Sequence, residues 1–249
     1  MQAVGRVALL LDAFTVERPE LTLGECSAAA GLSKSSAHRF LASLEEVQLV
    51  ERVGTRWRLG PRVVWLATVR LGHLDLRHEA APHLRGLGRR FHAATAFSIP
   101  NGSEMIYVER FDGPGAFGVN ARLGALAPIW GGASGRAILM RLSESERAAR
   151  LDADGWRALD ETVRREVLDE IDRGMDVGYC HERNSRFFPG IGGVAVPILD
   201  LHGVPVAALS VILPPTELND DLADEVGTAL RGVARELEEH HAPAKPAAH

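Results

Sequence analysis

The fold of the N-terminal part of the chain is decided by the stretch Leu21-Thr-Leu-Gly-Glu-Cys-Ser-Ala-Ala-Ala-Gly-Leu-Ser-Lys-Ser-Ser-Ala-His-Arg-Phe-Leu-Ala-Ser-Leu44. Thr22 and Glu25 have the spacing of a capping box, which predicts a helix beginning directly after Thr22. Gly31 ends this helix, and Ser33 has the side chain that caps a following one. Two short helices joined by a tight turn predict a helix-turn-helix.

The residues on either side of this stretch complete a winged helix-turn-helix. A first helix is predicted from apolar residues at spacings of three and four, namely Val4, Val7, Leu11 and Phe14. Residues 49–53 and 56–59 are β-prone runs around the turn Gly54-Thr55, and they predict a hairpin. Three helices and a hairpin place a winged helix-turn-helix domain at residues 1–61.

The remainder of the chain has a different pattern. Gly60-Pro61 breaks the chain, and residues 62–92 indicate a helical linker that runs into a second domain, with Pro82 expected to kink or divide the helix. Residues 93–240 alternate between strand-like and helical segments, and residues 241–249 form a Pro/Ala-rich tail that we expect to fray. The strands are predicted at 95–99, 105–108, 117–120, 193–199 and 204–213. Helices are predicted after Ser143, at 163–171 and along the apolar face from Leu222 to Leu237.

Composition excludes two broad classes of protein. With 46% hydrophobic and 24% charged residues, the 249-residue chain can bury a core, so that disorder of its bulk is excluded. The longest uncharged apolar stretch, residues 203–213, is shorter than the ~20 residues that a membrane-spanning helix needs, and we expect no membrane contact.

Two cysteines, Cys26 and Cys180, are too few for a disulfide framework and indicate a reducing, cytoplasmic compartment.

Basic residues gather in the first domain. Residues 1–62 hold eight of the 28 Lys and Arg and seven of the 33 Asp and Glu, so their balance is +1 while the remainder carries −6. A basic module on an acidic body suits contact with a polyanion at one end. Ala37, Leu41 and Leu44 are expected to face inward, which leaves hydrogen-bond donors near the start of the third helix facing solvent. This arrangement is typical of a recognition helix that contacts DNA. The alternative is an ordinary solvated helix face without a binding role. The candidate DNA contacts are Lys34, Ser35, Ser36, His38 and Arg39 on the helix and Arg52, Thr55 and Arg56 at the wing.

These segments resemble the IclR-type transcriptional regulators. The likeness begins with the helix-turn-helix, continues through Leu49-Val-Glu-Arg52 and Arg58-Leu-Gly-Pro-Arg62, and includes Val194-Ala-Val-Pro-Ile198 and Ala207-Ala-Leu-Ser-Val211. The resemblance implies an α+β chain with a GAF-like α/β effector-binding domain at residues 93–240. It also implies a homodimer or homotetramer that binds a double-stranded DNA operator as a repressor, with activation left open. In that family a small molecule, usually a carboxylic acid or an aromatic compound, controls DNA binding.

A turn of small residues, Trp130-Gly-Gly-Ala-Ser-Gly-Arg-Ala137, runs into a predicted helix of the second domain. The first backbone amides of a helix lack partners and suit an anion such as a carboxylate, although the glycines have tight packing as an alternative role. The resemblance implies effector contacts at Trp130, Ala133, Ser134, Glu182, Gly193, Ser210 and Ile212. The chain departs from the family at three of these positions. Trp130 stands where a smaller residue or His is common, Gly193 where a Cys can occur, and Ile212 where a Ser can occur.

Among these seven positions, Glu182 conflicts with an anionic ligand because of its own negative charge. Its carboxylate would repel an anionic ligand unless it is protonated, turned outward or paired with Arg183 or Arg186. We therefore expect Ser134 and Ser210 to contribute more directly to ligand binding.

Catalytic chemistry has little support in the sequence, and we expect neither enzymatic activity nor a cofactor. The turn before the predicted helix lacks the last glycine of G-x-S-x-G, because Arg136 stands there. His73, His78 and His83 are five residues apart and scatter around a helix, so no metal site is predicted. A small-molecule enzyme or a redox sensor carrying a DNA-binding head remains the alternative, with Cys180 either as the sensing thiol or as a buried, inert one.

Overall fold

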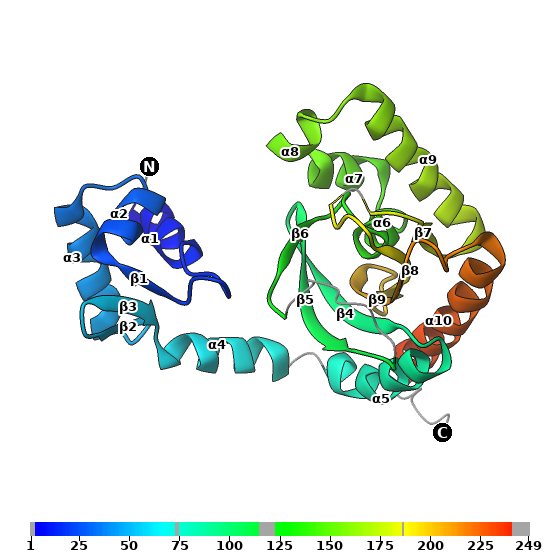
Figure 1. The fold of residues 1–249 in the computed structure, drawn as a ribbon, viewed down its shortest axis with the longest axis horizontal. Helices are drawn as coiled ribbons and strands as arrows, with labels where there is room; N and C mark the ends of the chain where they lie inside the picture. The colour runs from blue at the N-terminus through cyan, green and yellow to red at the C-terminus, as the bar shows by residue number, and fades with distance from the viewer. Residues whose placement is uncertain (1–2, 73–74, 115–122, 186, 241–249) are drawn as a thin grey trace, which may run out of the picture. The chain divides into compact units, whose positions relative to one another are not determined.

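The structure is a computed structural model that describes residues 3–72, 75–114, 123–185 and 187–240. The chain forms two compact units, Met1–Asp75 and Leu76–His249. Figure 1 shows the elements of each unit, and we describe the two units separately.

The first unit combines four helices with a small antiparallel sheet in the order β1-β3-β2. The unit's elements are α1 (Ala3–Asp12), β1 (Glu20–Thr22), α2 (Leu23–Ala29), α3 (Lys34–Glu46), β2 (Val50–Val53), β3 (Arg56–Leu59) and α4 (Pro61–Gly72). The predicted hairpin is the β2–β3 pair, in which Val53 lies opposite Arg56. Strand β1 was not predicted, since three residues are too few to show alternation, and it pairs with β3 through Leu21 and Trp57.

Local capping positions the two helices of the helix-turn-helix. The Thr22 hydroxyl accepts a hydrogen bond from the Glu25 amide while the Glu25 carboxylate accepts one from the Thr22 amide, so the predicted capping box is confirmed. Gly31 has a φ of +62°, a conformation that costs glycine little, and it turns the chain toward α3. The apolar sides of the three helices meet over the sheet in one core, which includes Leu10, Leu21, Cys26, Leu41, Leu44 and Trp57.

The second unit is built on a six-stranded antiparallel sheet in the order β6-β5-β4-β9-β8-β7. The strands are β4 (Ala94–Asn101), β5 (Glu104–Phe111), β6 (Leu126–Pro128), β7 (Cys180–Glu182), β8 (Gly192–Leu199) and β9 (Pro205–Leu213). The helices are α5 (Asp75–Arg90), α6 (Ala133–Leu139), α7 (Glu144–Leu151), α8 (Asp154–Arg157), α9 (Glu161–Val177) and α10 (Asp220–His240).

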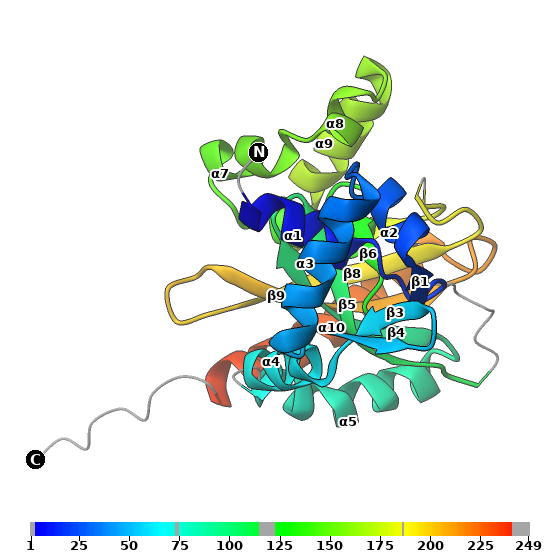
Figure 2. The same cartoon turned by 90° about the vertical axis from the view of Figure 1, so that its left-hand side faces the viewer.

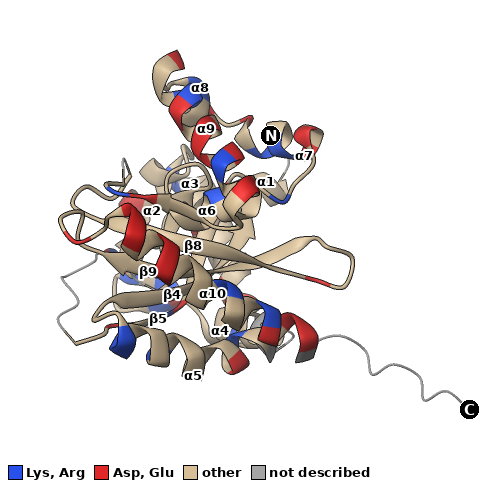
Figure 3. Cartoon of the chain, turned by 90° about the vertical axis from the view of Figure 1, so that its right-hand side faces the viewer, with Lys and Arg blue, Asp and Glu red and all other residues tan. Residues whose placement is uncertain are grey.

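Helices cover both faces of this sheet. Helices α6, α7, α8 and α9 lie on one side and α5 and α10 on the other, as both views show (Figures 1 and 2). Small residues on the first side, Ala195 of β8 and Ala208 of β9, pack against α6 in one core and let that helix approach the strands closely. In Figure 3 the ribbon of α10 is red at several positions of its first turns, which hold Asp220, Asp221, Asp224 and Glu225. Helix α6 lies mainly against the neighbouring strands β8 and β9.

Three sequence expectations meet different outcomes here. Pro82 does not divide the helical stretch: it lies inside α5, because a helix can lose one backbone hydrogen bond and continue when it packs on a sheet. Helix α4 ends at Gly72 and α5 begins at Asp75, and residues 73–74 lie outside the described part of the chain. The strand predicted at 117–120 and the whole predicted tail at 241–249 lie outside the described residues.

Candidate DNA-binding surface and ligand cavity

Helix α3 presents a polar face. Ala37, Leu41 and Leu44 are buried in the core of the first unit, which confirms the predicted inward side of the helix. Lys34, Ser35, His38 and Arg39 are exposed. Within the described part of the chain, no side-chain hydrogen bond or ion pair engages Lys34, His38 or Arg39. These three groups are therefore available to an external partner.

Ser36 takes part in the helix cap, and the Ser35 hydroxyl also lies 3.1 Å from that of the cap residue Ser33. The Ser36 amide donates to the Ser33 hydroxyl over 3.2 Å, and the Ser33 hydroxyl donates to the Ser36 hydroxyl over 3.0 Å. Ser36 is half-buried. The geometry gives it a part in fixing the start of α3, where an orphan helix amide needs an acceptor.

The wing arginines also have partners inside the protein. Arg52 Nε donates to the carbonyl of Gly54 over 3.0 Å, so this side chain folds back along the turn. Arg56 donates to the carbonyl of Glu20 over 3.2 Å and lies 3.7 Å from the Glu25 carboxylate. Arg56 thereby ties the sheet to the capped start of α2. Thr55, at the tip of the hairpin, is exposed.

In the second unit a small cavity lies between the start of α6 and strands β8 and β9. Its volume is about 30 Å³, which is room for about one water molecule. Six of the seven predicted effector contacts line it: Ala133, Ser134, Glu182, Gly193, Ser210 and Ile212. Ser210 is buried, and its hydroxyl has no hydrogen-bond partner among the described residues. A buried hydroxyl without a partner favours a ligand that supplies one.

Trp130, the seventh predicted residue, does not line this cavity. Its indole packs against Trp156 with ring centroids 6.3 Å apart, in the core that includes Ile138 and Ile171. The turn before α6 directs this large apolar side chain toward α8 and α9, where it is buried. The glycines of the turn are partly a packing requirement, since a Cβ at Gly135 would collide with the carbonyl of Ile129.

Sequence reasoning missed the aromatic side of the cavity. Tyr107 of β5 and Phe188 line it and meet edge to face, with centroids 6.3 Å apart and an interplanar angle of 73°. Burial raises the pKa of Tyr107 to about 12, so it is a neutral phenol, and it hydrogen-bonds Ser134. The sequence signal that could have found this side of the cavity is the adjacent aromatic pair Phe187-Phe188, which stands between the predicted helix at 163–171 and the predicted strand at 193–199. Gly132, Ser185, Ile191 and Gly192 complete the lining.

Glu182 is paired, but with a residue that the sequence did not suggest. Its Oε2 lies 3.1 Å from the guanidinium of Arg136, which is only 2% exposed. The same guanidinium donates to the Trp130 carbonyl over 3.0 Å and to the Glu170 carboxylate. Arg183, one of the two expected partners, instead binds Asp220 over 2.8 Å, and Arg186 lies outside the described residues. The ion pair with Arg136 fixes the carboxylate of Glu182 at the cavity.

The carboxylate of Glu182 also occupies the position at which we predicted an anion. It accepts a hydrogen bond from the Ala133 amide, at the start of α6, and another contact comes from Ser185. Burial nevertheless raises the pKa of Glu182 from 4.5 to about 7, outweighing the lowering by Arg136, Ser185 and the Ala133 amide. Of the alternatives for Glu182, protonation near neutral pH is supported, whereas the expected pairing with Arg183 is wrong because Arg136 takes that place.

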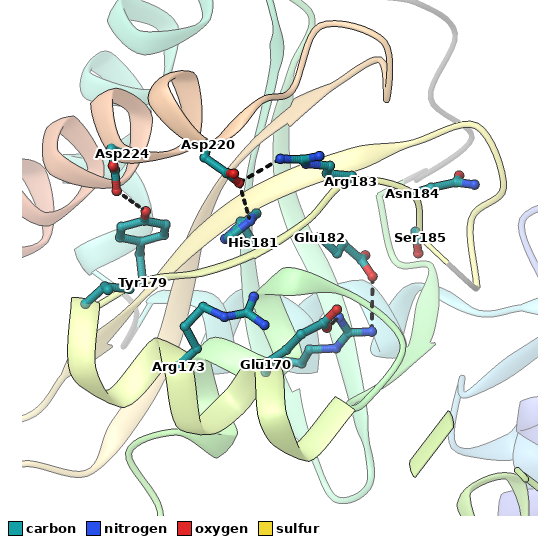
Figure 4. Close-up of a pocket in the computed structure, with 12 residues that line it drawn as sticks. Glu170, Arg173, Tyr179, His181, Glu182, Arg183, Asn184, Ser185, Asp220 and Asp224 are labelled. Carbon is teal, nitrogen blue, oxygen red and sulfur yellow. Dashed lines mark hydrogen bonds and ion pairs between the residues drawn. The ribbon is translucent and has the colours of Figure 1, made fainter. Parts of the chain in front are cut away.

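A larger polar cleft adjoins the cavity on the outer side of β7. Its volume is about 840 Å³, and it shares Glu182 and Ser185 with the cavity. Figure 4 shows Glu170 and Arg173 of α9 facing His181 and Glu182 of β7. Several side chains that line the cleft are hydrogen-bonded to one another, among them Tyr179 to Asp224 and Arg183 to Asp220.

The geometry gives no support to the redox-sensor alternative. Burial raises the pKa of Cys180 to about 12, and its sulfur packs 3.7 Å from that of Met140, so the reactive thiolate is disfavoured. Among the residues described, no group of His, Cys, Asp and Glu side chains is arranged to hold a metal ion. None of the described helices is both long enough and apolar enough to span a membrane.

A winged helix-turn-helix joined to an α/β unit with a polar cavity defines the class of ligand-binding transcriptional regulators. Two family models match in turn: the IclR helix-turn-helix domain at residues 3–54 and the C-terminal domain of the bacterial transcriptional regulator IclR at residues 68–239. The chain therefore belongs to the IclR family, with a DNA-binding and an effector-binding domain, and the predicted architecture is confirmed.

Similar proteins agree with this assignment. The HTH-type transcriptional regulator KipR of Bacillus subtilis (strain 168) is 30% identical over 92% of this chain and 94% of its own length. XynR of Escherichia coli (strain K12), also an HTH-type transcriptional regulator, is 27% identical over 88% of this chain and 89% of its length. An IclR homolog from Microbacterium hydrocarbonoxydans, solved in complex with 4-hydroxybenzoate, is 26% identical, with a TM-score of 0.80 over 96% of this chain and 99% of its own. The two relatives are named as regulators and not as enzymes.

Proposed function

We propose that this protein is a repressor that binds a DNA operator through α3 and the wing, and that a small carboxylic acid in the cavity of the second unit releases it. The observation that carries the DNA-binding part is the exposed, unpaired set Lys34, His38 and Arg39 on the face of α3 opposite the core. Regulators act where the chromosome is, so we place the protein in the cytoplasm.

Each side chain on this surface has a role that follows from its chemistry. Lys34 and Arg39 contact phosphates, and Ser35 and His38 read base edges in the major groove. Thr55 and Arg52 contact the backbone or minor groove at the wing. Arg56 and Ser36 act mainly by holding the wing and the start of α3 in place, because Arg56 joins the wing to Glu20 of β1 and Ser36 joins the cap residue Ser33. The internal bond of Arg52 stays within the wing turn, so Arg52 keeps its position at the tip.

For the effector, the cavity supports an organic acid with an apolar, preferably aromatic body. Tyr107, Phe188 and Ile212 supply the apolar walls, and the hydroxyls of Ser134 and Ser210 supply donors for a carboxylate. The complex of a homologous protein with 4-hydroxybenzoate supports the same class of ligand. A ring does not fit into about 30 Å³, so we infer that Phe188 and Ile191 move outward as the effector binds.

Operator binding by two heads requires at least a dimer, since half-sites lie at a fixed spacing. Helix α4 supports this proposal, because Val64 and Trp65 are 68% and 58% exposed and Leu66 and Val69 are exposed as well. Val4 on α1 adds a further exposed apolar side chain. Apolar groups in this number on one short segment favour burial against a second copy.

The test is selection of an operator from random DNA with the full-length protein, followed by titration with benzoate, 4-hydroxybenzoate and aliphatic acids. We expect one palindromic sequence to be enriched, and at least one acid to release it. A reporter gene behind that sequence then distinguishes repression from activation. Chemical conversion of an acid by the purified protein would instead favour the alternative of an enzyme with a DNA-binding head.

A further inference from the structure

Glu182 is the one charged side chain among the described residues that line the ligand cavity. The other polar groups there are hydroxyls, those of Tyr107, Ser134, Ser185 and Ser210, and the rest of the lining is apolar or glycine. Arg136 contacts Glu182 but lines the neighbouring cleft and not the cavity. A carboxylate that enters the cavity therefore meets a carboxylate of the protein, with no cation on its own side.

We propose that Glu182 makes effector binding proton-coupled: a carboxylate enters the cavity together with one proton, which Glu182 holds between its own oxygen and the ligand. The inference rests on the proposed function, in which the effector is a carboxylic acid. The proton comes from solvent, and the only bond formed is the O–H of the Glu182 carboxyl group. Glu182 then donates a hydrogen bond to the bound carboxylate in place of repelling it.

The groups that surround Glu182 permit this protonation near neutral pH. Arg136 of α6 and the Ala133 amide favour the charged form, while Glu170 of α9 and the burial of the side chain disfavour it. Tyr107 of β5 faces it as a neutral phenol. The balance leaves the pKa of Glu182 at about 7, so that the carboxyl group of the free protein gains or loses its proton within the physiological range.

The direction of the pH dependence follows from linkage. A bound anion raises the pKa of Glu182 further, so the complex holds a proton that the free protein has lost above about pH 7. Each further pH unit then weakens the binding of the acid about tenfold. Below about pH 6 the free protein is already protonated, and the affinity becomes independent of pH until the ligand itself is protonated. A neutral ligand of the same shape shows no such dependence.

The experiment uses isothermal calorimetry of the full-length protein with benzoate and its neutral counterpart benzamide, from about pH 6 to pH 8.5. Titrations at pH 8 are repeated in two buffers of different ionisation enthalpy, which gives the number of protons taken up. We expect uptake of about one proton per benzoate and none per benzamide. Benzoate should lose about tenfold in affinity for each unit above pH 7, while benzamide should lose none.

Two variants locate the effect. Glu182→Gln keeps the size and a donor but cannot titrate, so benzoate binding should become independent of pH and proton uptake should vanish. Glu170→Gln is the matched control, because Glu170 also binds Arg136 but lines the cleft only. This control should keep the tenfold slope, shifted slightly along the pH axis.

Pairs of outcomes separate this inference from the proposed function. Benzoate binding of equal strength at pH 6 and pH 8.5, without proton uptake, would overturn the role of Glu182 and leave the acid-responsive regulator intact. A pH slope that persists in Glu182→Gln would overturn the role of Glu182 in the same way. Failure of both probes to bind at pH 6, where Glu182 is protonated, would overturn the aromatic-acid effector and this inference together, while leaving operator binding untouched.

Discussion

Arg136 and Glu182 form a buried ion pair, 3.1 Å from nitrogen to oxygen, between the first helix after the glycine turn and the edge strand of the sheet. The arginine is 2% exposed and the glutamate 7%, so neither charge is solvated by bulk water. Arg136 reaches the Trp130 carbonyl on its own turn and Glu170 on α9 as well. One guanidinium thus joins α6, α9 and β7 beside the ligand cavity.

The raised pKa of Glu182 predicts a stability that falls with pH. The carboxyl group has a pKa of about 7 in the folded protein and near 4.5 when unfolded, so between these values the folded state holds more protons. Its contribution to stability is complete below pH 4.5 and is lost as the pH rises through 7. At about 1.4 kcal/mol per pKa unit, the loss is on the order of 3 kcal/mol.

Urea denaturation at pH 5 and pH 8 tests this prediction on wild type and Glu182→Gln. The wild type should lose more free energy of unfolding across this interval than the variant, by on the order of 3 kcal/mol. Arg136→Met should be strongly destabilising at pH 8, by about 3–5 kcal/mol, because it leaves Glu182 buried without its cation. Equal slopes for wild type and Glu182→Gln would show that Glu182 titrates normally.

The second prediction concerns the recognition helix. Lys34→Ala and Arg39→Ala should each weaken operator binding across all sequences and lower the slope of log affinity against log salt by about one, since each removes one phosphate contact. His38→Ala should instead relax the preference at one base pair. Mobility shifts at several salt concentrations measure both effects. Arg90→Ala, an exposed arginine of the second unit paired with Glu225, is the matched control and should leave affinity and slope unchanged.

The wing arginine Arg56 should behave differently from Lys34. Its bonds to Glu20 and Glu25 hold the sheet on the start of α2, so Arg56→Ala should lower the stability of the first unit as well as its affinity for DNA. We expect the cost to be about 1 kcal/mol or less, because both members of the ion pair are nearly half exposed. A pure loss of one unit in the salt slope, with unchanged unfolding, would return Arg56 to the class of simple phosphate contacts.

The fourth prediction concerns assembly through α4. Val64→Glu places a charge on the exposed apolar segment of this helix and should weaken self-association at least tenfold, because a carboxylate would have to be desolvated at the contact. Sedimentation equilibrium at micromolar concentration measures the change. Val204→Glu is the control, since Val204 is also exposed but lies beside the turn of the β8–β9 hairpin. A wild type that sediments as a monomer and binds DNA one to one would refute the dimer.

Structural features were predictable from the sequence where the residues that form them lie close together in the chain. The capping box of Thr22 and Glu25 acts within one turn of helix, and it correctly predicted where the first helix of the helix-turn-helix begins. Strands β1 and β7 have three residues each, too few for alternation to be visible. The Arg136–Glu182 pair joins residues that are 46 positions apart, and no periodicity links them.

The cavity shows the same division between local and long-range signals. Six of the seven effector contacts that the family resemblance implied line it: two at the start of α6, one on each of β7 and β8, and the alternating pair Ser210 and Ile212 on β9. Trp130 does not line the cavity, because its indole packs against Trp156 of α8, a helix that the sequence did not predict. Tyr107 and Phe188 come together only through the tertiary fold.

The last prediction tests the cavity as the effector site. Ser134 is buried at the first turn of α6, where its hydroxyl bonds Tyr107 beside the carboxyl group of Glu182. Ser134→Asp adds a second carboxylate to a space that already holds one, so an acid should no longer bind and the operator should no longer be released. Operator binding itself should survive, because α3 and the wing belong to the other unit.

Ser134→Ala loses the same hydroxyl without adding charge and should retain most of the response, weakened by roughly tenfold or less, which corresponds to one hydrogen bond. Ser145→Asp, an exposed serine on α7, controls for the added charge. Release of the operator by an aromatic acid with unchanged affinity in Ser134→Asp would show that the effector binds elsewhere and that the glycine turn serves packing alone.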